Sequence, residues 1–178
     1  MRHSSDAGRR PAHAPRGEAE TGTTTTDPPV RRWGVIRTSV WVSIHAPPGR
    51  VVATFLDYAR WPTVFPLTIA GTELVRRSPS TLEVMVHHRE EGRVLNVLII
   101  RRPDVVELRE YKRRFDATFV NRFEPAPEGT RYTIDATVRL AWPYSLLAPL
   151  LAPLLRGVVE RALRRYTLEP MRAAAESR

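Results

Sequence analysis

Residues 142–171 read WPYSLLAPLLAPLLRGVVERALRRYTLEPM, an apolar, proline-containing opening followed by a basic amphipathic segment. Apolar residues recur here at steps of three and four, the spacing of one helical face: Leu147, Leu151, Leu154, Val158, Ala162 and Tyr166. The charged residues on the other side are Arg156, Glu160, Arg161, Arg164 and Arg165. Because Pro149 and Pro153 each remove a backbone hydrogen-bond donor, we expect the regular helix to begin near Leu154. A helix with one apolar face needs a surface to cover.

That surface is predicted upstream, where the hydrophobic pattern has a period of two. Apolar and polar residues alternate over residues 32–44, which is typical of a half-buried strand. The strand ends at Pro47-Pro48, because paired prolines cannot continue a ladder of backbone hydrogen bonds. Residues 49–58 carry apolar residues at helical spacing, and a second short helical turn follows, with Trp61 and Phe65 four residues apart on one face.

The chain continues as six further strand-like segments separated by short turns. They cover residues 68–77, 81–89, 93–101, 105–112, 115–124 and 130–142. Connections of hairpin length favour antiparallel neighbours. We therefore predict an α+β fold, in which a curved seven-stranded antiparallel sheet has two short helices after its first strand and the long C-terminal helix packed over it. A cavity left between sheet and helix would be a ligand site.

The N-terminal residues differ in composition from the rest of the chain. They contain no apolar run and are rich in Pro, Gly, Ala, Thr and Arg, which is typical of disorder. We therefore expect a disordered tail over residues 1–30 and one domain over residues 31–178. A secretory signal would need an apolar core that this stretch lacks, so we expect a cytoplasmic protein.

Composition excludes several kinds of site. The chain has no cysteine, which rules out disulfides, thiolate metal sites and cysteine nucleophiles. The formal charge of +9 rests almost entirely on arginine, since Lys112 is the only lysine. The basic residues are dispersed over many strands, without a recognition helix or an aromatic-basic platform, so we expect no nucleic-acid partner.

Two stretches resemble a known family. Residues 42–66, VSIHAPPGRVVATFLDYARWPTVFP, resemble the opening of the START-like helix-grip (SRPBCC) superfamily, in which a strand ending in Ala-Pro leads to a helix, Asp-Tyr, an aromatic residue and Pro. Residues 119–140, FVNRFEPAPEGTRYTIDATVRL, with the basic helix that follows, are similar to the polyketide cyclase/dehydrase and lipid transport family, including its coenzyme Q-binding-like members. The resemblance extends from about Trp33 to Glu176. It implies the helix-grip fold, but this superfamily includes aromatase/cyclases, ligand carriers, lipid-transfer proteins and stress proteins.

The candidate ligand-binding residues are those expected to face the cavity. They are Trp61, Phe65, Asn96, Phe115, Phe119, Asn121, Tyr132, Ile134, Trp142, Leu147, Leu151, Leu154 and Val158. Asn96 and Asn121 interrupt apolar stripes, so each would project a polar group inward, unless a neighbouring group satisfies it or it lies at the rim. Tyr132 could orient a carbonyl or a phenol. Arg122 should lie on the outer face, because its parity opposes that of Phe119 and Phe123.

Other polar residues give no recognisable catalytic or metal motif. His87 and His88 are adjacent on a strand, so one of them should point inward. No carboxylate or third histidine has metal-ligand spacing, and there is no Ser/His/Asp arrangement and no glycine-rich phosphate loop. We therefore expect neither a metal nor a cofactor.

A membrane contact is a further hypothesis for the leucine-proline segment. Residues 141–155 are 15 residues almost without polarity, too few to span a bilayer, which takes about 20 apolar residues. Transient contact of residues 146–155 with a membrane surface is one interpretation, with the nearby arginines approaching anionic head groups. The alternative is that these leucines pack on the sheet.

Three functional hypotheses follow. The first is a non-catalytic carrier or chaperone of a lipid, an isoprenoid quinone or a polyketide, and we favour it because no catalytic set is evident. The second is a polyketide aromatase/cyclase or dehydratase, with Asn96, Asn121, Tyr132 and one histidine as polar groups in the cavity. The third is an interaction module whose cavity is filled by its own side chains.

Overall fold

The computed structural model describes residues 34–113, 115–142 and 144–177, and the side chains of the same residues except 144 and 146–151. The strands are β1 (Val35–Ile44), β2 (Ile69–Ser78), β3 (Thr81–His88), β4 (Gly92–Arg102), β5 (Val105–Tyr111), β6 (Phe115–Ala126) and β7 (Gly129–Leu140). The helical elements are α1 (Pro48–Leu56), a 3-10 turn (Tyr58–Arg60), α2 (Trp61–Val64), α3 (Tyr144–Leu163), a π-helical turn (Arg164–Leu168) and α4 (Glu169–Glu176). The predicted tail of residues 1–30 lies outside the described residues.

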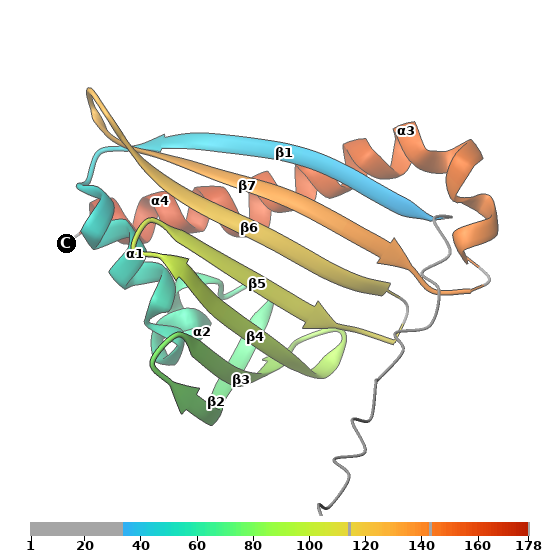
Figure 1. Cartoon of the computed structure of the whole chain (residues 1–178), viewed down its shortest axis with the longest axis horizontal. Helices are drawn as coiled ribbons and strands as arrows, with labels where there is room; N and C mark the ends of the chain where they lie inside the picture. The colour runs from blue at the N-terminus through green and yellow to red at the C-terminus, as the bar shows by residue number, and fades with distance from the viewer. Residues whose placement is uncertain (1–33, 114, 143, 178) are drawn as a thin grey trace, which may run out of the picture. The chain divides into compact units, whose positions relative to one another are not determined.

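The sheet confirms the predicted fold. Its seven strands lie in the order β1-β7-β6-β5-β4-β3-β2, and all neighbours are antiparallel. Each pair of neighbours from β2 to β7 is consecutive in the chain and joined by a hairpin. The remaining pair joins the first strand, β1, to the last, β7. Figure 1 shows α1, α2 and α4 gathered at one end of the sheet, whereas α3 begins at the other end.

The C-terminal helix begins earlier than expected. It starts at Tyr144 and not near Leu154, so Pro149 and Pro153 lie inside it. Proline removes one helical hydrogen bond at each position. Because the two prolines are four residues apart, both missing bonds fall on the same side of the helix, and the bonds on its other sides continue.

The predicted covering face of this helix is wrong. Leu154 and Val158 are 63% and 47% exposed. The residues that pack toward the sheet are the next ones along the chain, Leu155, Val159 and Leu163. Two polar contacts with β1 explain why the helix is rotated by about one residue from the predicted face. The Thr38 hydroxyl donates a hydrogen bond of 2.5 Å to the Glu160 carboxylate, and Arg164 donates to the Trp41 carbonyl at 3.4 Å.

The π-helical turn lets the buried face continue into α4. From Leu163 to the next buried residue, Leu168, is a step of five, which an α-helix would place on another face. The wider turn over Arg164–Leu168 absorbs the extra residue. Met171 and Ala175 then follow at steps of three and four, and both are fully buried. The two helices therefore cover the sheet with one continuous stripe.

Aromatic side chains pack beneath α1 and α2. Trp61 and Phe65 lie on one face, as predicted, with ring centroids 6.2 Å apart. The Trp61 indole N–H donates a hydrogen bond of 2.8 Å to the Phe55 carbonyl. Phe123 and Tyr132, paired across β6 and β7, stack at 4.8 Å, and both are completely buried. Such ring contacts stabilise the fold by more than the burial of their apolar area alone.

The β6–β7 hairpin is fixed against the end of β1. Gly129 has φ +134°, and a Cβ there would overlap the carbonyl oxygen of Ile44. The next residue, Thr130, donates a hydroxyl hydrogen bond of 2.6 Å to the Ala46 carbonyl. Only glycine combines this backbone conformation with so close an approach.

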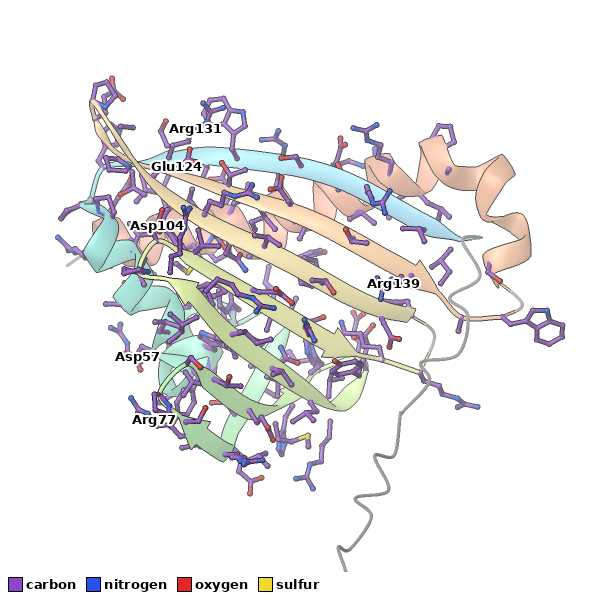
Figure 2. All side chains as sticks on the ribbon, viewed as in Figure 1. Asp57, Arg77, Asp104, Glu124, Arg131 and Arg139 are labelled. Carbon is purple, nitrogen blue, oxygen red and sulfur yellow. The ribbon has the colours of Figure 1, made fainter. Side chains whose placement is uncertain are left out.

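The outer face of the sheet is charged. Figure 2 shows Glu124 and Arg131 at one end of the β6–β7 pair and Arg139 toward the other end. Arg122 forms an ion pair with Asp135 on this face, as its parity predicted. The guanidinium of Arg131 lies 4.6 Å from the centre of the Trp41 ring. The helices cover the opposite face of the sheet.

Candidate functional site

The covered face of the sheet has two parts that differ in burial. The closed end lies beside α1, α2 and α4. It is formed by Asn121, Phe123 and Tyr132 of the sheet with Phe55 of α1 and Trp61 of α2, all of them buried. The half-buried end, beside α3, consists of Leu108, Glu110, Lys112, Phe115, Phe119 and Leu140. Strand register places all of them except Lys112 on one face, since Leu108 pairs with Phe119 and Phe115 with Leu140. Lys112 follows the end of β5, and its ammonium lies beside the Phe115 ring. The apolar members are partly buried and pack against the core. Leu155 and Val159 of α3 pack against the same buried cluster as Phe115, Phe119 and Leu140, which is formed by Ile36, Ala117 and Val138.

Asn121 and Tyr132 form a hydrogen-bonded unit at the closed end. The Tyr132 hydroxyl donates to Asn121 Oδ1 at 2.8 Å, and Asn121 Nδ2 donates to the carbonyls of Val106 and Phe119 at 3.1 and 3.2 Å. Burial raises the pKa of the Tyr132 phenol, which therefore stays protonated. The Asn121 side chain therefore has its hydrogen bonds made by neighbouring groups, which is one of the alternatives stated for it above.

Asn96 lies at the border of the half-buried end. Its Nδ2 donates a hydrogen bond of 3.2 Å to the Glu110 carboxylate on the neighbouring strand. The side chain is 2% exposed, and its Oδ1 has no hydrogen-bond partner among the described residues. Asn96 thus holds Glu110 in place and keeps one unused acceptor.

Lys112 and two carboxylates form the charged part of this end. The Lys112 ammonium lies 2.5 Å from a Glu91 carboxylate oxygen and 3.2 Å from one of Glu110, and 5.1 Å from the centre of the Phe115 ring. Burial acts to lower the pKa of Lys112, but Glu110 and Glu91 outweigh it and raise the pKa above its ordinary value. Lys112 is therefore a cation at neutral pH.

Sequence reasoning missed Glu110 and Lys112 as site residues. The signal was present, because Leu108, Glu110 and Lys112 alternate and so share a face. The pairing with Glu91 was not accessible from the pattern, since it depends on where the β3–β4 turn lies beside the end of β5.

His88 is the inward member of the histidine pair. It shares a face with the buried residues Val84 and Val86, and its Nε2 is buried without a partner among the described residues. Burial is the main cause that lowers the pKa of His88; the Lys112 cation lowers it further, while Glu110 and Glu91 oppose the shift. The imidazole is therefore neutral at pH 7.

The other predicted residues are spread over the molecule. Ile134 is buried in the core, next to the closed end, and so is Phe65. Trp142 is 75% exposed, because β7 ends at Leu140 and its alternation does not reach residue 142. The side chains of Leu147 and Leu151 lie outside the described residues. Of the predicted set, Phe115, Phe119 and Asn96 therefore come together at the half-buried end, while Leu154 and Val158 lie on the exposed side of α3.

Two surface hollows are formed by other residues. One, of about 640 Å³, lies beside β1 and is lined by Trp41, Val42, Ser43, His45, Arg164, Arg172 and Glu176. The other, of about 440 Å³, lies between α2 and the C-terminal helix, where Phe65, Leu67, Tyr166 and Pro170 line it. Neither is lined by residues of the half-buried end.

Two features are absent from the described part of the chain, a metal cluster and a membrane-spanning helix. Within it, no group of three or more His, Asp or Glu side chains is arranged to hold a metal ion. Over the same residues, no helix has the length and apolar character needed to cross a membrane.

The chain matches one known family over most of its length. The family described as polyketide cyclase / dehydrase and lipid transport matches the chain over residues 35–176. A search of the curated proteins found no significant match.

Several solved structures are similar in fold. The di-domain ARO/CYC BexL from the BE-7585A biosynthetic pathway has 21% identity and a TM-score of 0.64, over 81% of this chain and 51% of BexL. The aromatase/cyclase Zhui from Streptomyces sp. R1128 has 19% identity and a TM-score of 0.62, over 81% of this chain and 95% of Zhui. Ara h 8.0201 has 15% identity and a TM-score of 0.60, over 82% of this chain and all of that one, 100%. This chain spans about half the length of the di-domain proteins StfQ and BexL. At these identities the likeness shows a shared fold.

Proposed function

The chain belongs to the polyketide cyclase / dehydrase and lipid transport family, and from this membership we propose that it binds a hydrophobic small molecule at its half-buried end. The observation that carries the proposal is the incomplete burial of Leu108, Phe115 and Phe119 on the covered face of the sheet. Covering such area with apolar ligand atoms is favourable by about 25 cal/mol per Å². A lipid, an isoprenoid quinone or a polyketide would each supply these atoms, and we favour carriage or chaperoning as the role.

The closed end is a poor alternative location for the ligand. Its rings are in contact with one another, as in the stacked pair of Phe123 and Tyr132. A ligand there would have to displace side chains from a packed core, which costs more than covering a half-buried surface.

Ligand capture tests this proposal. Native mass spectrometry of the purified protein, with a panel of lipids, quinones and polyketides, should find an apolar ligand bound. Leu108→Gln should weaken the binding about tenfold, because it places an amide on the contact surface. Val97→Gln, on the neighbouring strand but the outer face, is the matched control and should leave binding unchanged. Equal effects of the two variants, or no binding across the panel, would contradict the proposal and favour a domain filled by its own side chains.

A second candidate is a polyketide aromatase/cyclase or dehydratase acting at the same end. The observation in its favour is that Glu110, Lys112 and His88 place groups able to hold or move protons beside the apolar surface. A poly-ketone mimic incubated with the protein should then give a changed product distribution, and Glu110→Gln should abolish the change. A distribution identical to that without protein speaks against catalysis.

Membrane contact and domain extent are further proposals. Exposed Trp142 and Leu154 at the two ends of the leucine-proline segment support transient contact of residues 146–155 with a membrane surface. Cosedimentation with phosphatidylglycerol vesicles should fall for Leu154→Ser if that contact forms.

We also propose that residues 31–178 suffice for ligand binding, which a chain lacking residues 1–30 would test.

A further inference from the structure

Among the described residues, the charges at the half-buried end do not balance. Two carboxylates, of Glu91 and Glu110, face one ammonium, that of Lys112. In the part of the chain that the structure describes, neither carboxylate forms an ion pair with an arginine. With His88 neutral, the polar cluster of Glu91, Glu110, Lys112, Asn96 and His88 has one more negative than positive group.

The hydrogen-bonding capacity of the cluster is also unequal. An ammonium has three donors, and Lys112 directs it at two carboxylates. Asn96 already uses Nδ2 on Glu110, whereas its Oδ1 has no partner among the described residues. The Glu110 side chain is 12% exposed and lies beside half-buried Leu108, so its oxygens border the proposed contact surface. Acceptors therefore outnumber donors where a ligand's polar group would arrive.

The net charge of the whole chain favours anionic ligands, in opposition to the local carboxylates, but its effect at this site is weaker. The whole chain carries a formal charge of +9, which favours anions. Salt screens charges in solvent over about 8 Å at physiological ionic strength. The Lys112 and Glu110 charges are screened less, because these side chains are 14% and 12% exposed, whereas Glu91 is 42% exposed. The local charges should therefore decide the choice of ligand head group.

We propose, resting on the proposed function, that the half-buried end selects neutral hydroxyl-bearing ligands over carboxylates with the same apolar body. A hydroxyl donates a hydrogen bond to the acceptors of Glu110 and Asn96. A carboxylate brings a second excess negative charge to a site whose one lysine is already paired, and no donor to meet the free acceptors. The substrate class is thus an apolar alcohol or phenol.

Matched pairs of ligands test this inference on the full chain by isothermal titration calorimetry. The pH is about 7.5, at which the carboxylic acid of each ligand pair is ionised. The aliphatic pair is 1-decanol and decanoate, and the aromatic pair is 2-naphthol and 2-naphthoate, which separates the two sources of a hydroxyl. In at least one pair the hydroxyl compound should bind about tenfold more tightly than the carboxylate. A carboxylate that binds equally well or better in both pairs overturns the inference while leaving the proposed function standing. Absence of binding by all four compounds overturns the proposed function, and the inference with it.

Two charge-neutralising variants on one strand locate the selectivity. Glu110→Gln removes one negative charge but keeps an oxygen for Asn96, and it should reduce the preference to less than about threefold. Glu107→Gln is the control, because Glu107 lies on the outer face of β5 and pairs with Arg101 and Arg109. It should leave the preference unchanged. Equal effects of both variants overturn the assignment to this cluster. Glu91→Gln, in the exposed β3–β4 turn, should act in the same direction as Glu110→Gln and replaces it if that variant does not fold.

Discussion

Strand β6 crosses both ends of the covered face, and its phenylalanines differ in burial along its length. Phe123 is completely buried and stacks on Tyr132, whereas Phe115 and Phe119 on the same strand and face remain half-buried. The closed end is covered by α1, α2 and α4 together, while α3 is the one helix among the described residues that lies at the half-buried end. The same strands are thus tightly packed at one end and leave half-buried apolar surface at the other, where we propose that the ligand binds.

Truncating one phenylalanine at each end should give the largest difference. Phe123→Ala removes a fully packed ring and should lower the free energy of unfolding by about 3–5 kcal/mol. Phe119→Ala, at the half-buried end, should cost about 1–2 kcal/mol, because part of its area is exposed already. Urea unfolding of the two variants measures both values. Equal losses would mean that the two ends do not differ in packing.

Removing the Tyr132 hydroxyl should affect stability and not binding. Tyr132→Phe leaves Asn121 Oδ1 buried without its donor, at a cost of about 1–3 kcal/mol. Affinity for an apolar ligand, measured by calorimetry, should equal that of the unmodified chain. A fall in affinity without a fall in stability would place the ligand at the closed end instead.

The two neighbouring leucines of α3 test which helical face covers the half-buried end. Leu155→Ala should lower the free energy of unfolding by about 1–2 kcal/mol, since this side chain packs against the sheet. Leu154→Ala should change it by less than about 0.5 kcal/mol, because Leu154 is exposed. Chemical unfolding of both variants compares them directly, and the reverse order would restore the face predicted from sequence.

The smallest effect concerns the pH dependence of stability. The pKa of His88 lies below its ordinary value of 6.5. Burial is the main cause and the Lys112 cation adds to it, while Glu110 and Glu91 act to raise the pKa. The unfolded chain therefore takes up a proton that the folded chain binds only at lower pH, so stability is lost as the pH falls below 6.5. His88→Gln should flatten the fall in urea midpoint between about pH 7 and about pH 5. His87→Gln is the control and should retain it; the opposite result would assign the titration to the outer face.

The strands and their parity were predictable, because alternation fixes the face of each residue. Arg122 on the outer face follows from that rule. The shared buried face of Trp61 and Phe65 follows from their four-residue helical spacing. The rotation of the helix was not predictable, because Leu154/Val158 and Leu155/Val159 form adjacent apolar stripes of equal period. The contact between Thr38 and Glu160 distinguishes them, and it joins residues far apart in the chain.

The burial of residues within the site also could not be predicted from the sequence. Asn121 and Asn96 both interrupt apolar stripes, but only register shows that Tyr132 satisfies Asn121, while Asn96 meets Glu110. The choice between closed and half-buried ends depends on which helices reach each part of the sheet. Periodicity carries no information about that coverage.

The most direct test is to map a bound ligand by NMR. Amide and methyl shifts of the full chain, titrated with 2-naphthol, should change most at Leu108, Phe119 and Glu110 and stay nearly constant at Phe123 and Tyr132. The largest shifts at Phe123 and Tyr132, or at Leu67 and Tyr166 in the hollow beside α2, would contradict binding at the half-buried end.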